Sequence, residues 1–254
     1  MRLFRRRAKR ETAGTMPLMD HLVELRRRLL IAFAAIAVCG VIVFIFYNPV
    51  LNFLSGPYQE VTRNTQGCGR SGCKLIVTDP LAPFMVRLKI AGYGGLALAV
   101  PIVMWEIWRF IVPGLNHGER RYAAGFAISA IVLFALGCVV AWFTITKALD
   151  FLLGVGGSQL RPLIDANKYL TLVMLMFAAF GFAFEFPLLL VFLMLVGVVN
   201  THQLRHSRRW AAVGITTFAA IITPSQDPFS LLFMAVPMYI FYEGAILVGR
   251  MMKR

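Results

Sequence analysis

Long uncharged runs constrain the fold of this chain more than any other feature. Residues 29–46 contain no charged side chain, and residues 122–146 form a second uncharged run of 25 residues. A helix needs about 20 mainly apolar residues to cross about 30 Å of bilayer hydrocarbon. A β-barrel would instead show alternating segments of about ten residues. We therefore expect an all-α polytopic membrane protein.

The composition agrees with this expectation. Of the 254 residues, 59% are hydrophobic and only 15% are charged, whereas soluble domains have roughly 45–50% apolar and about 25% charged residues. These values exclude a soluble globular domain, a disordered chain and a small disulfide scaffold. We expect a single membrane domain.

The apolar runs predict six transmembrane helices. The fifth run has 13 residues and measures about 20 Å at roughly 1.5 Å per residue. Spans 5 and 6 are therefore expected to be short, and the alternatives are that they thin the bilayer locally or rely on neighbouring helices. Before the first span, residues 16–28 predict an amphipathic helix on the membrane surface, and residues 1–15 a basic extension that is not a cleaved signal. The predicted spans are about 29–47, 86–111, 122–148, 168–198, 210–222 and 228–248.

Basic residues gather on one predicted face of the membrane. Of the 26 Lys and Arg residues, 18 lie in the N-terminal segment, the second and fourth connections and the C-terminal tail. The positive-inside rule then places both termini in the cytoplasm, in a multi-pass cytoplasmic (inner or plasma) membrane protein. The net charge of +14 is interpreted as a topology signal and as attraction to anionic lipids, and not as nucleic-acid binding.

The predicted outer loop, residues 47–83, carries Cys68 and Cys73. On an oxidising face these cysteines can close a small disulfide loop, and the alternative is two free thiols. Two cysteines are too few for a zinc site, and the histidines lie apart from them, so we expect no metal. The sequence also lacks nucleotide-binding, hydrolase and haem-attachment motifs, which predicts neither a cofactor nor an enzymatic activity.

Three acidic residues are candidates for a function on the basic face. Glu24 shares a helix face with Arg28, Glu119 follows the second span, and Glu106 is a weaker candidate near the end of that span. One interpretation is that Glu24 and Glu119 each form an exposed ion pair with a nearby arginine, which contributes little. The alternative is a pair of carboxylates that accepts guanidinium groups, whose planar fork lysine cannot reproduce.

Glu185 stands near the middle of the fourth predicted span, between aromatic residues. A charge at mid-bilayer costs about 2.5–3.5 kcal/mol on insertion scales. Glu185 is therefore expected to face a polar cavity, pair with a partner or be protonated. The interpretations left open are a transport or proton-coupled site and a protonated carboxyl in a hydrogen bond between helices.

Several motifs together make the chain resemble the TatC family, the multispanning core subunit of twin-arginine protein translocases. The resemblance covers nearly all of residues 16–250. Single motifs are weak, but their order and spacing are specific. They occupy residues 21–26, 79–84, 108–115, 117–121, 180–187 and 223–225.

The resemblance implies a translocase that exports folded proteins and draws on the proton-motive force. Its implied partners are TatA- and TatB-type single-span subunits, twin-arginine signal peptides of folded substrates and further copies of the chain itself. Glu24 and Glu119 match the family acids that receive the two arginines, and Glu185 matches the family's mid-membrane acid. We assign His21, Arg26 and Glu106 to the same signal-peptide site, although Glu106 replaces a more usual glutamine.

A proton-coupled small-solute transporter centred on Glu185 is the alternative function. It predicts substrate-dependent proton flux by the chain alone, whereas a translocase subunit needs its partners and cargo.

Overall fold

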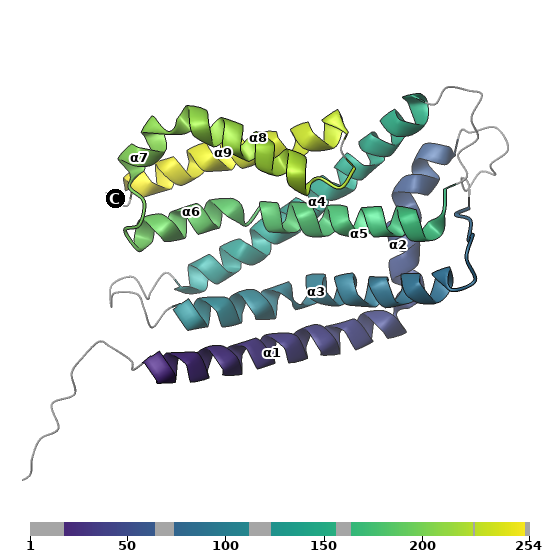
Figure 1. Ribbon diagram of the computed structural model, residues 1–254, viewed down its shortest axis with the longest axis horizontal. Helices are drawn as coiled ribbons and strands as arrows, with labels where there is room; N and C mark the ends of the chain where they lie inside the picture. The colour runs from purple at the N-terminus through teal and green to yellow at the C-terminus, as the bar shows by residue number, and fades with distance from the viewer. Residues whose placement is uncertain (1–17, 64–73, 112–122, 156–163, 226, 252–254) are drawn as a thin grey trace, which may run out of the picture.

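The computed structural model describes residues 18–63, 74–111, 123–155, 164–225 and 227–251. These residues form helices, and the β-structure among them is one isolated parallel bridge between Ile76 and Asp165. Figure 1 shows the helices in one bundle. In chain order they are α1 (Leu18–Ile45), α2 (Tyr47–Thr62), α3 (Ala82–Ile111), α4 (Ala123–Val155), α5 (Ala166–Ala183), α6 (Phe186–Leu195), α7 (Thr201–His206), α8 (Arg208–Ile222) and α9 (Pro228–Met251).

Within the described residues, five helical segments are long and apolar enough to cross a membrane, which confirms the all-helical polytopic membrane fold. They are Leu22–Ile45, Ala82–Phe110, Gly125–Val155, Ala166–Leu195 and Pro228–Met251. The remaining predicted span is α8, whose 15 residues extend about 22 Å at roughly 1.5 Å per residue. The helix α9 has 24 residues and ends three residues beyond the predicted sixth span. Of the two spans expected to be short, α8 is therefore the markedly short one.

The N-terminal part of the fold differs from the sequence prediction. The predicted surface helix at residues 16–28 does not end before the first span, because α1 continues without a break from Leu18 to Ile45. The segment holds no glycine or proline between Leu18 and Cys39, and its three consecutive arginines favour a helix. Residues 18–28 are therefore the first turns of the spanning helix.

The predicted outer loop at residues 47–83 contains a helix, α2, that the sequence prediction missed. Pro57 lies inside α2 and removes one main-chain donor. Next to this proline, the main-chain N–H of Tyr58 donates to the hydroxyl of Tyr169 at 3.3 Å, and that hydroxyl donates to the carbonyl of Leu54 at 3.0 Å. A phenol from α5 thus takes a place in the hydrogen-bond ladder of α2, which no local pattern predicts.

The predicted fourth span is two helices, α5 and α6, joined at Phe184 and Glu185. Pro187 has no N–H to donate to the carbonyl of Ala183, so the regular ladder stops there. The main-chain N–H of Glu185 instead donates to the carbonyl of Phe182, at 3.1 Å. Figure 1 shows that α6 follows on from α5 in nearly the same direction.

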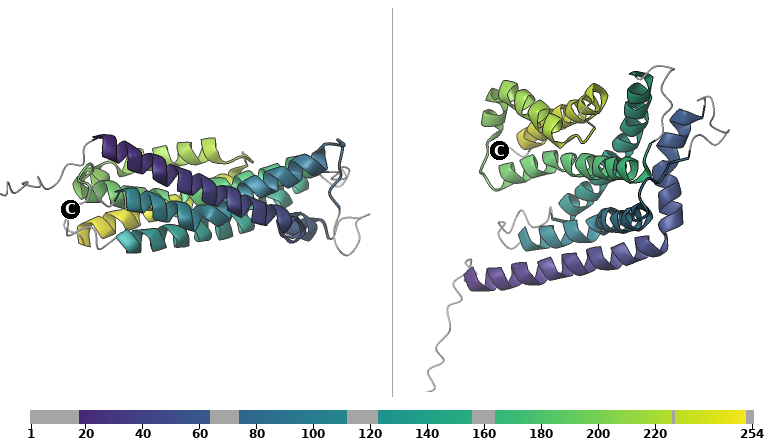
Figure 2. Two further views of the ribbon diagram at one scale, coloured as in Figure 1. Left: turned by 90° about the horizontal axis from the view of Figure 1, so that it is seen from below. Right: turned by 45° about the vertical axis from the view of Figure 1, so that its right-hand side comes forward.

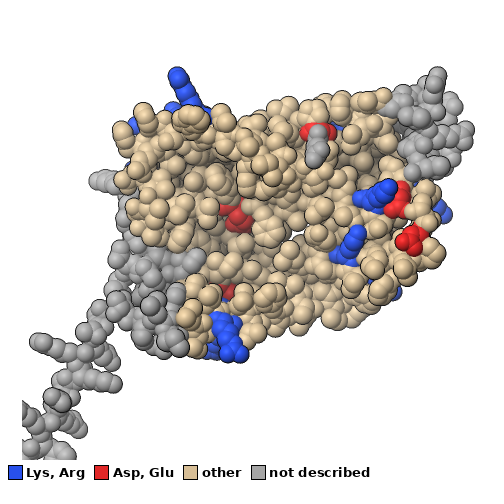
Figure 3. Space-filling model, viewed as in Figure 1, with Lys and Arg blue, Asp and Glu red and all other residues tan. Residues whose placement is uncertain are grey.

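Opposite ends of the bundle carry different elements. The start of α1, the end of α3 and the end of α9 lie at one end, which we call the N/C end (Figure 1). The helix α2 and the bridge between Ile76 and Asp165 lie at the other, which we call the α2 end. In Figure 3 the visible face is largely uncharged between the two ends, apart from isolated acidic groups, as a membrane-spanning surface requires.

The helices α1 and α3 lie side by side in all views (Figures 1 and 2). Glycines permit their close approach: a Cβ atom added at Gly95 would lie 2.6 Å from both the Cα and the main-chain nitrogen of Gly40. Small residues of this kind let membrane helices pack backbone against backbone. The glycine contact therefore sets the separation of the two helices that carry the site described next.

Candidate functional site

Two carboxylates from different helices meet on one guanidinium group at the N/C end. Arg28 in α1 donates from Nη2 and Nε to one oxygen of Glu24, at 2.6 and 3.1 Å, and from Nη1 to Glu106 in α3, at 2.8 Å. The side chains are mostly shielded, with exposed fractions of 16% for Arg28, 23% for Glu24 and 10% for Glu106. This ion-pair network joins α1 to α3.

The network lines a cavity of about 380 Å³. The other lining residues are Val23, Ile31, Arg27 and Arg109. Within the described part of the chain, the second oxygen of Glu24 and that of Glu106 receive no hydrogen bond. Each of the two carboxylates thus keeps one acceptor oxygen that no described residue uses, and the low exposure of Glu24 and Glu106 strengthens a charge-assisted hydrogen bond to it.

Aromatic packing holds the end of α3 that carries Glu106. Trp108 is buried, and its ring centroid lies 4.4 Å from that of Phe126 in α4 and 5.6 Å from that of Phe192 in α6. These contacts fix the last turns of α3 against two other helices. The position of Glu106 is therefore set by α3, α4 and α6, and that of Glu24 by α1.

The structure brings together part of the predicted set. Glu24 and Glu106 meet, whereas Arg26 is exposed and outside the cavity lining. The side chain of His21 and all of Glu119 lie outside the described residues, as do Cys68 and Cys73. The disulfide and the role of Glu119 therefore stay predictions.

Arg28 is the site residue that the sequence interpretation left out. It follows Glu24 by four residues, the spacing at which a glutamate and an arginine meet on one helix face. That spacing indicated the pair within α1. Nothing local indicated that the same guanidinium also reaches Glu106, 78 residues further along the chain.

Glu185 lies apart from this network, at the junction of α5 and α6. Its side chain is half-buried, and its Oε1 is fully shielded and has no hydrogen-bond partner among the described residues. The predicted placement of an acid inside a spanning segment is thus seen in the structure, because the segment Ala166–Leu195 contains it. No described cation neutralises this carboxyl group.

The family model for the Sec-independent protein translocase protein (TatC) matches residues 20–237. A TatC protein of Frankia casuarinae is 39% identical over 96% of this chain and 68% of its own length, and one of Aquifex aeolicus is 35% identical over 94% and 97%. A crystal structure of a twin-arginine translocase receptor, TatC, superposes with a TM-score of 0.76 at 33% identity, covering 92% of this chain and all of that one. The chain belongs to the TatC family.

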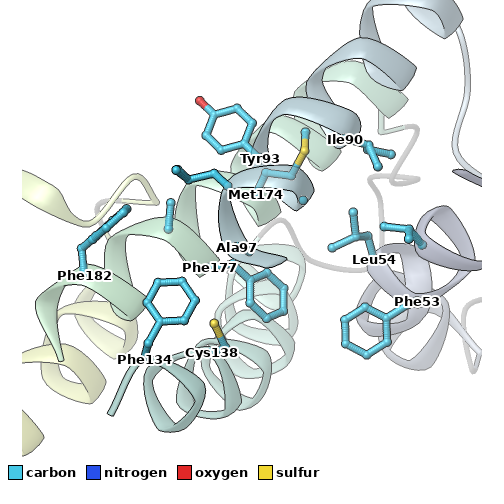
Figure 4. Close-up of a pocket in the computed structure, with 14 residues that line it drawn as sticks. Phe53, Leu54, Ile90, Tyr93, Ala97, Phe134, Cys138, Met174, Phe177 and Phe182 are labelled. Atoms are coloured by element: carbon cyan, nitrogen blue, oxygen red, sulfur yellow. The ribbon is translucent and has the colours of Figure 1, made fainter. Parts of the chain in front are cut away.

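This TatC-family chain holds a second, apolar cavity of about 180 Å³ between α2, α3, α4 and α5. Figure 4 shows Phe53, Phe134 and Phe177 converging on it from three of these helices. Its lining contains no charged side chain. It therefore offers no charged group that would hold an arginine.

At the α2 end of this TatC-family chain, Asp165 connects two segments that are distant in sequence. Its carboxylate accepts from the hydroxyl of Thr78 at 2.6 Å and from the main-chain N–H groups of Asn167 and Lys168 at 3.0 Å each. The hydrogen bond from Thr78, with those from the main chain, lowers the pKa of Asp165. Asp165 thereby caps α5 and holds residues 76–78 beside it.

Proposed function

We propose that this translocase subunit is the receptor for twin-arginine signal peptides. The cavity that contains Glu24, Arg28 and Glu106 is the place where the arginines bind. The observation that carries the proposal is that carboxylates from α1 and α3 converge on a guanidinium group already. A site whose carboxylates already accept charge-assisted hydrogen bonds from one guanidinium has the acceptors and the spacing to hold another in its place.

Residues outside the described part complete the proposed site. Glu119 lies in the connection between α3 and α4, which begins directly after the end of α3 that holds Glu106. Glu24 and Glu106 would together receive one arginine, as they now share Arg28, and Glu119 would supply the acceptor for the second arginine. His21 and Arg26 flank Glu24 in the same motif, and we assign them to contacts with the remainder of the peptide.

The basic character of the N/C end supports a cytoplasmic placement of that end. Arg27 and Arg109 line the cavity, and Arg205, Arg208, Arg209 and Arg250 belong to elements near the same end. By the positive-inside rule, we propose that both termini face the cytoplasm and that the chain resides in the cytoplasmic membrane. Signal peptides of newly made folded proteins then reach the cavity without crossing the membrane.

The proposed role is non-enzymatic and depends on partners. TatA- and TatB-type single-span subunits, anionic lipids and further copies of the chain would form the working assembly, with export driven by the proton-motive force. We propose that Glu185 acts after binding, because its shielded oxygen is inside the spanning region and Glu185 does not line the receptor cavity. Membership in a translocase family favours this role over a small-solute transporter.

Binding of the purified chain to two signal peptides tests the proposal. One peptide carries Arg-Arg and the other Lys-Lys, so their charge is equal and only the guanidinium geometry differs. We expect the Arg-Arg peptide to bind more tightly, and Glu24→Gln to weaken its binding by about 10–150-fold, the equivalent of about 1.5–3 kcal/mol for a hydrogen bond to a charged group.

Glu60→Gln is the matched control, because Glu60 is an exposed acid on α2, at the other end of the bundle. It removes the same charge and should leave the affinity for both peptides unchanged. Equal affinities of the two peptides for the unaltered chain, or equal effects of the two substitutions, would show that the cavity is not an arginine receptor.

A further inference from the structure

We propose that Arg28 is an internal competitor of the signal peptide. It occupies the carboxylates of Glu24 and Glu106 in the empty receptor, and an incoming arginine must displace it. This inference rests on the proposed function, since it concerns the regulation of the same site. The ion pairs of Arg28 then lower the apparent affinity of the site, because a ligand must compete with Arg28 for the same carboxylates.

The first argument is chemical identity. Arg28 donates from all three of its guanidinium nitrogens, two to Glu24 and one to Glu106. A peptide arginine presents the same planar fork of donors and seeks the same oxygens. Because one oxygen of Glu24 receives two hydrogen bonds from Arg28, an incoming guanidinium could reach only the other oxygen, and a two-bond fork on the carboxylate forms only after Arg28 leaves.

The second argument is charge. Among the described residues, the cavity lining holds two carboxylates and three arginines, a net charge of +1 before any ligand enters. A peptide with two arginines would raise the total to +3 if nothing moved. Like charges within a few ångströms repel strongly where water is scarce, so displacement of Arg28 towards solvent is more favourable than simple addition of the peptide.

The third argument is how easily Arg28 can change its position. The bond to Glu24 lies within one helix, four residues apart, so its loss does not disturb the helix. The contact between α1 and α3 is held independently by the close approach of Gly40 and Gly95. A ligand guanidinium offers Glu24 and Glu106 the same charge-assisted hydrogen bonds that Arg28 gives up, so Arg28 can exchange with a ligand without leaving these shielded carboxylates unpaired.

Arg28→Lys tests the proposal without changing charge. Lysine lacks the planar fork that bridges Glu24 and Glu106, so it competes less well for the two carboxylates. If the carboxylates are free in between a half and a tenth of the molecules, their release raises the affinity by about two- to tenfold, because apparent affinity scales with the competent fraction. We expect Arg28→Lys to bind the Arg-Arg peptide more tightly within this range, and Arg28→Gln more tightly still.

Arg27 supplies the matched controls. It is the preceding residue on α1, it lines the same cavity and it is exposed, but it makes no ion pair with a described residue. Arg27→Lys and Arg27→Gln therefore make the same chemical changes without releasing a carboxylate. The gains for Arg28 must exceed those for Arg27, and circular dichroism melts confirm that all four variants are folded.

The outcomes separate the inference from the proposed function. A preference of the unaltered chain for Arg-Arg, with Arg28 variants that bind no more tightly than the Arg27 variants, overturns the competitor role alone. Weaker binding by both Arg28 variants also overturns it, since it would mean that Arg28 positions Glu24 for the ligand. No preference for Arg-Arg over Lys-Lys in any form overturns the receptor proposal itself.

Discussion

Replacing Gly95 by alanine tests whether the contact between α1 and α3 holds the site together. The added Cβ atom would lie 2.6 Å from the Cα and nitrogen of Gly40 and 3.1 Å from the carbonyl oxygen of Ile36. All three atoms belong to the main chain, so no side-chain rotation relieves the clash. The helices must separate by about 0.8 Å to reach the 3.4 Å of ordinary contact.

The expected cost follows from overpacking, which destabilises a packed interior by about 1–3 kcal/mol. Alanine also favours a helix over glycine by about 0.8–1 kcal/mol, so the change must be compared with a control that has the same gain. Gly92→Ala is that control, because nothing lies within 4 Å of a Cβ atom added at Gly92, one turn earlier in α3.

Thermal unfolding in detergent, followed by circular dichroism, measures the difference. For a chain of this size about 1–3 kcal/mol corresponds to a melting temperature about 2–12 °C lower for Gly95→Ala than for Gly92→Ala. Arg-Arg peptide affinity should fall in parallel, because Glu24 and Glu106 move apart. Equal melting temperatures for the two variants would refute the claim that this glycine contact sets the helix separation.

Three further predictions concern other parts of the fold. Tyr169→Phe should lower the free energy of unfolding by about 1–3 kcal/mol, because it removes a buried hydroxyl that forms hydrogen bonds with the main chain of α2. Tyr239→Phe is the control, and equal melting temperatures of the two variants would contradict the prediction. The hydrogen bond from Thr78, with weaker ones from the main chain, lowers the pKa of Asp165 below its ordinary 3.8. The stability that the ionised Asp165 adds to the fold is therefore present above pH 3.8 and is lost as the pH falls through the lowered pKa. Between pH 6 and pH 3 the melting temperature of Asp165→Asn should therefore fall less than that of the unaltered chain. An equal fall in both would contradict the stabilising role of Asp165. Glu185→Gln should abolish export by vesicles while leaving peptide affinity unchanged, and full export by that variant would exclude a role for the acid.

Much of the fold is legible in the sequence because membrane hydrocarbon imposes a simple rule. Uncharged runs of about 20 residues have to be helices, since no other local structure satisfies every main-chain polar group in lipid. The helices α3, α4 and α9 accordingly begin within four residues of the predicted spans. Pro187 is visible in the sequence as a break in the helix ladder, and the structure divides the fourth span beside it.

The missed features depend on contacts between distant segments. The helix α2 contains Pro57 and is supported by the hydroxyl of Tyr169, more than 100 residues away. Its start gives no strong local signal, because Tyr47 to Thr62 mixes polar and apolar residues. The surface helix predicted for residues 16–28 was a local interpretation of an amphipathic pattern, and the continuous α1 prevails because no residue ends the helix.

The residues of the candidate site were predictable from the sequence, but their arrangement was not. Acidic residues on a strongly basic face are few, so Glu24 and Glu106 could be selected from the sequence. The sequence could not show that both acids contact one guanidinium, because this contact requires α1 and α3 to lie in register along a glycine contact. Helical spacing indicated Arg28 as a neighbour of Glu24, but only the fold shows that it joins both acids.

Position-specific photo-crosslinking tests the central claim most directly. A photoreactive residue at Val23, which is exposed and lines the receptor cavity, is compared with one at Val77, which is equally apolar and lines a cavity at the α2 end. We predict that an Arg-Arg signal peptide is captured at Val23 and not at Val77, and that excess Arg-Arg peptide abolishes capture far more effectively than Lys-Lys peptide. Capture at Val77 alone, or equal competition by the two peptides at Val23, would contradict the account.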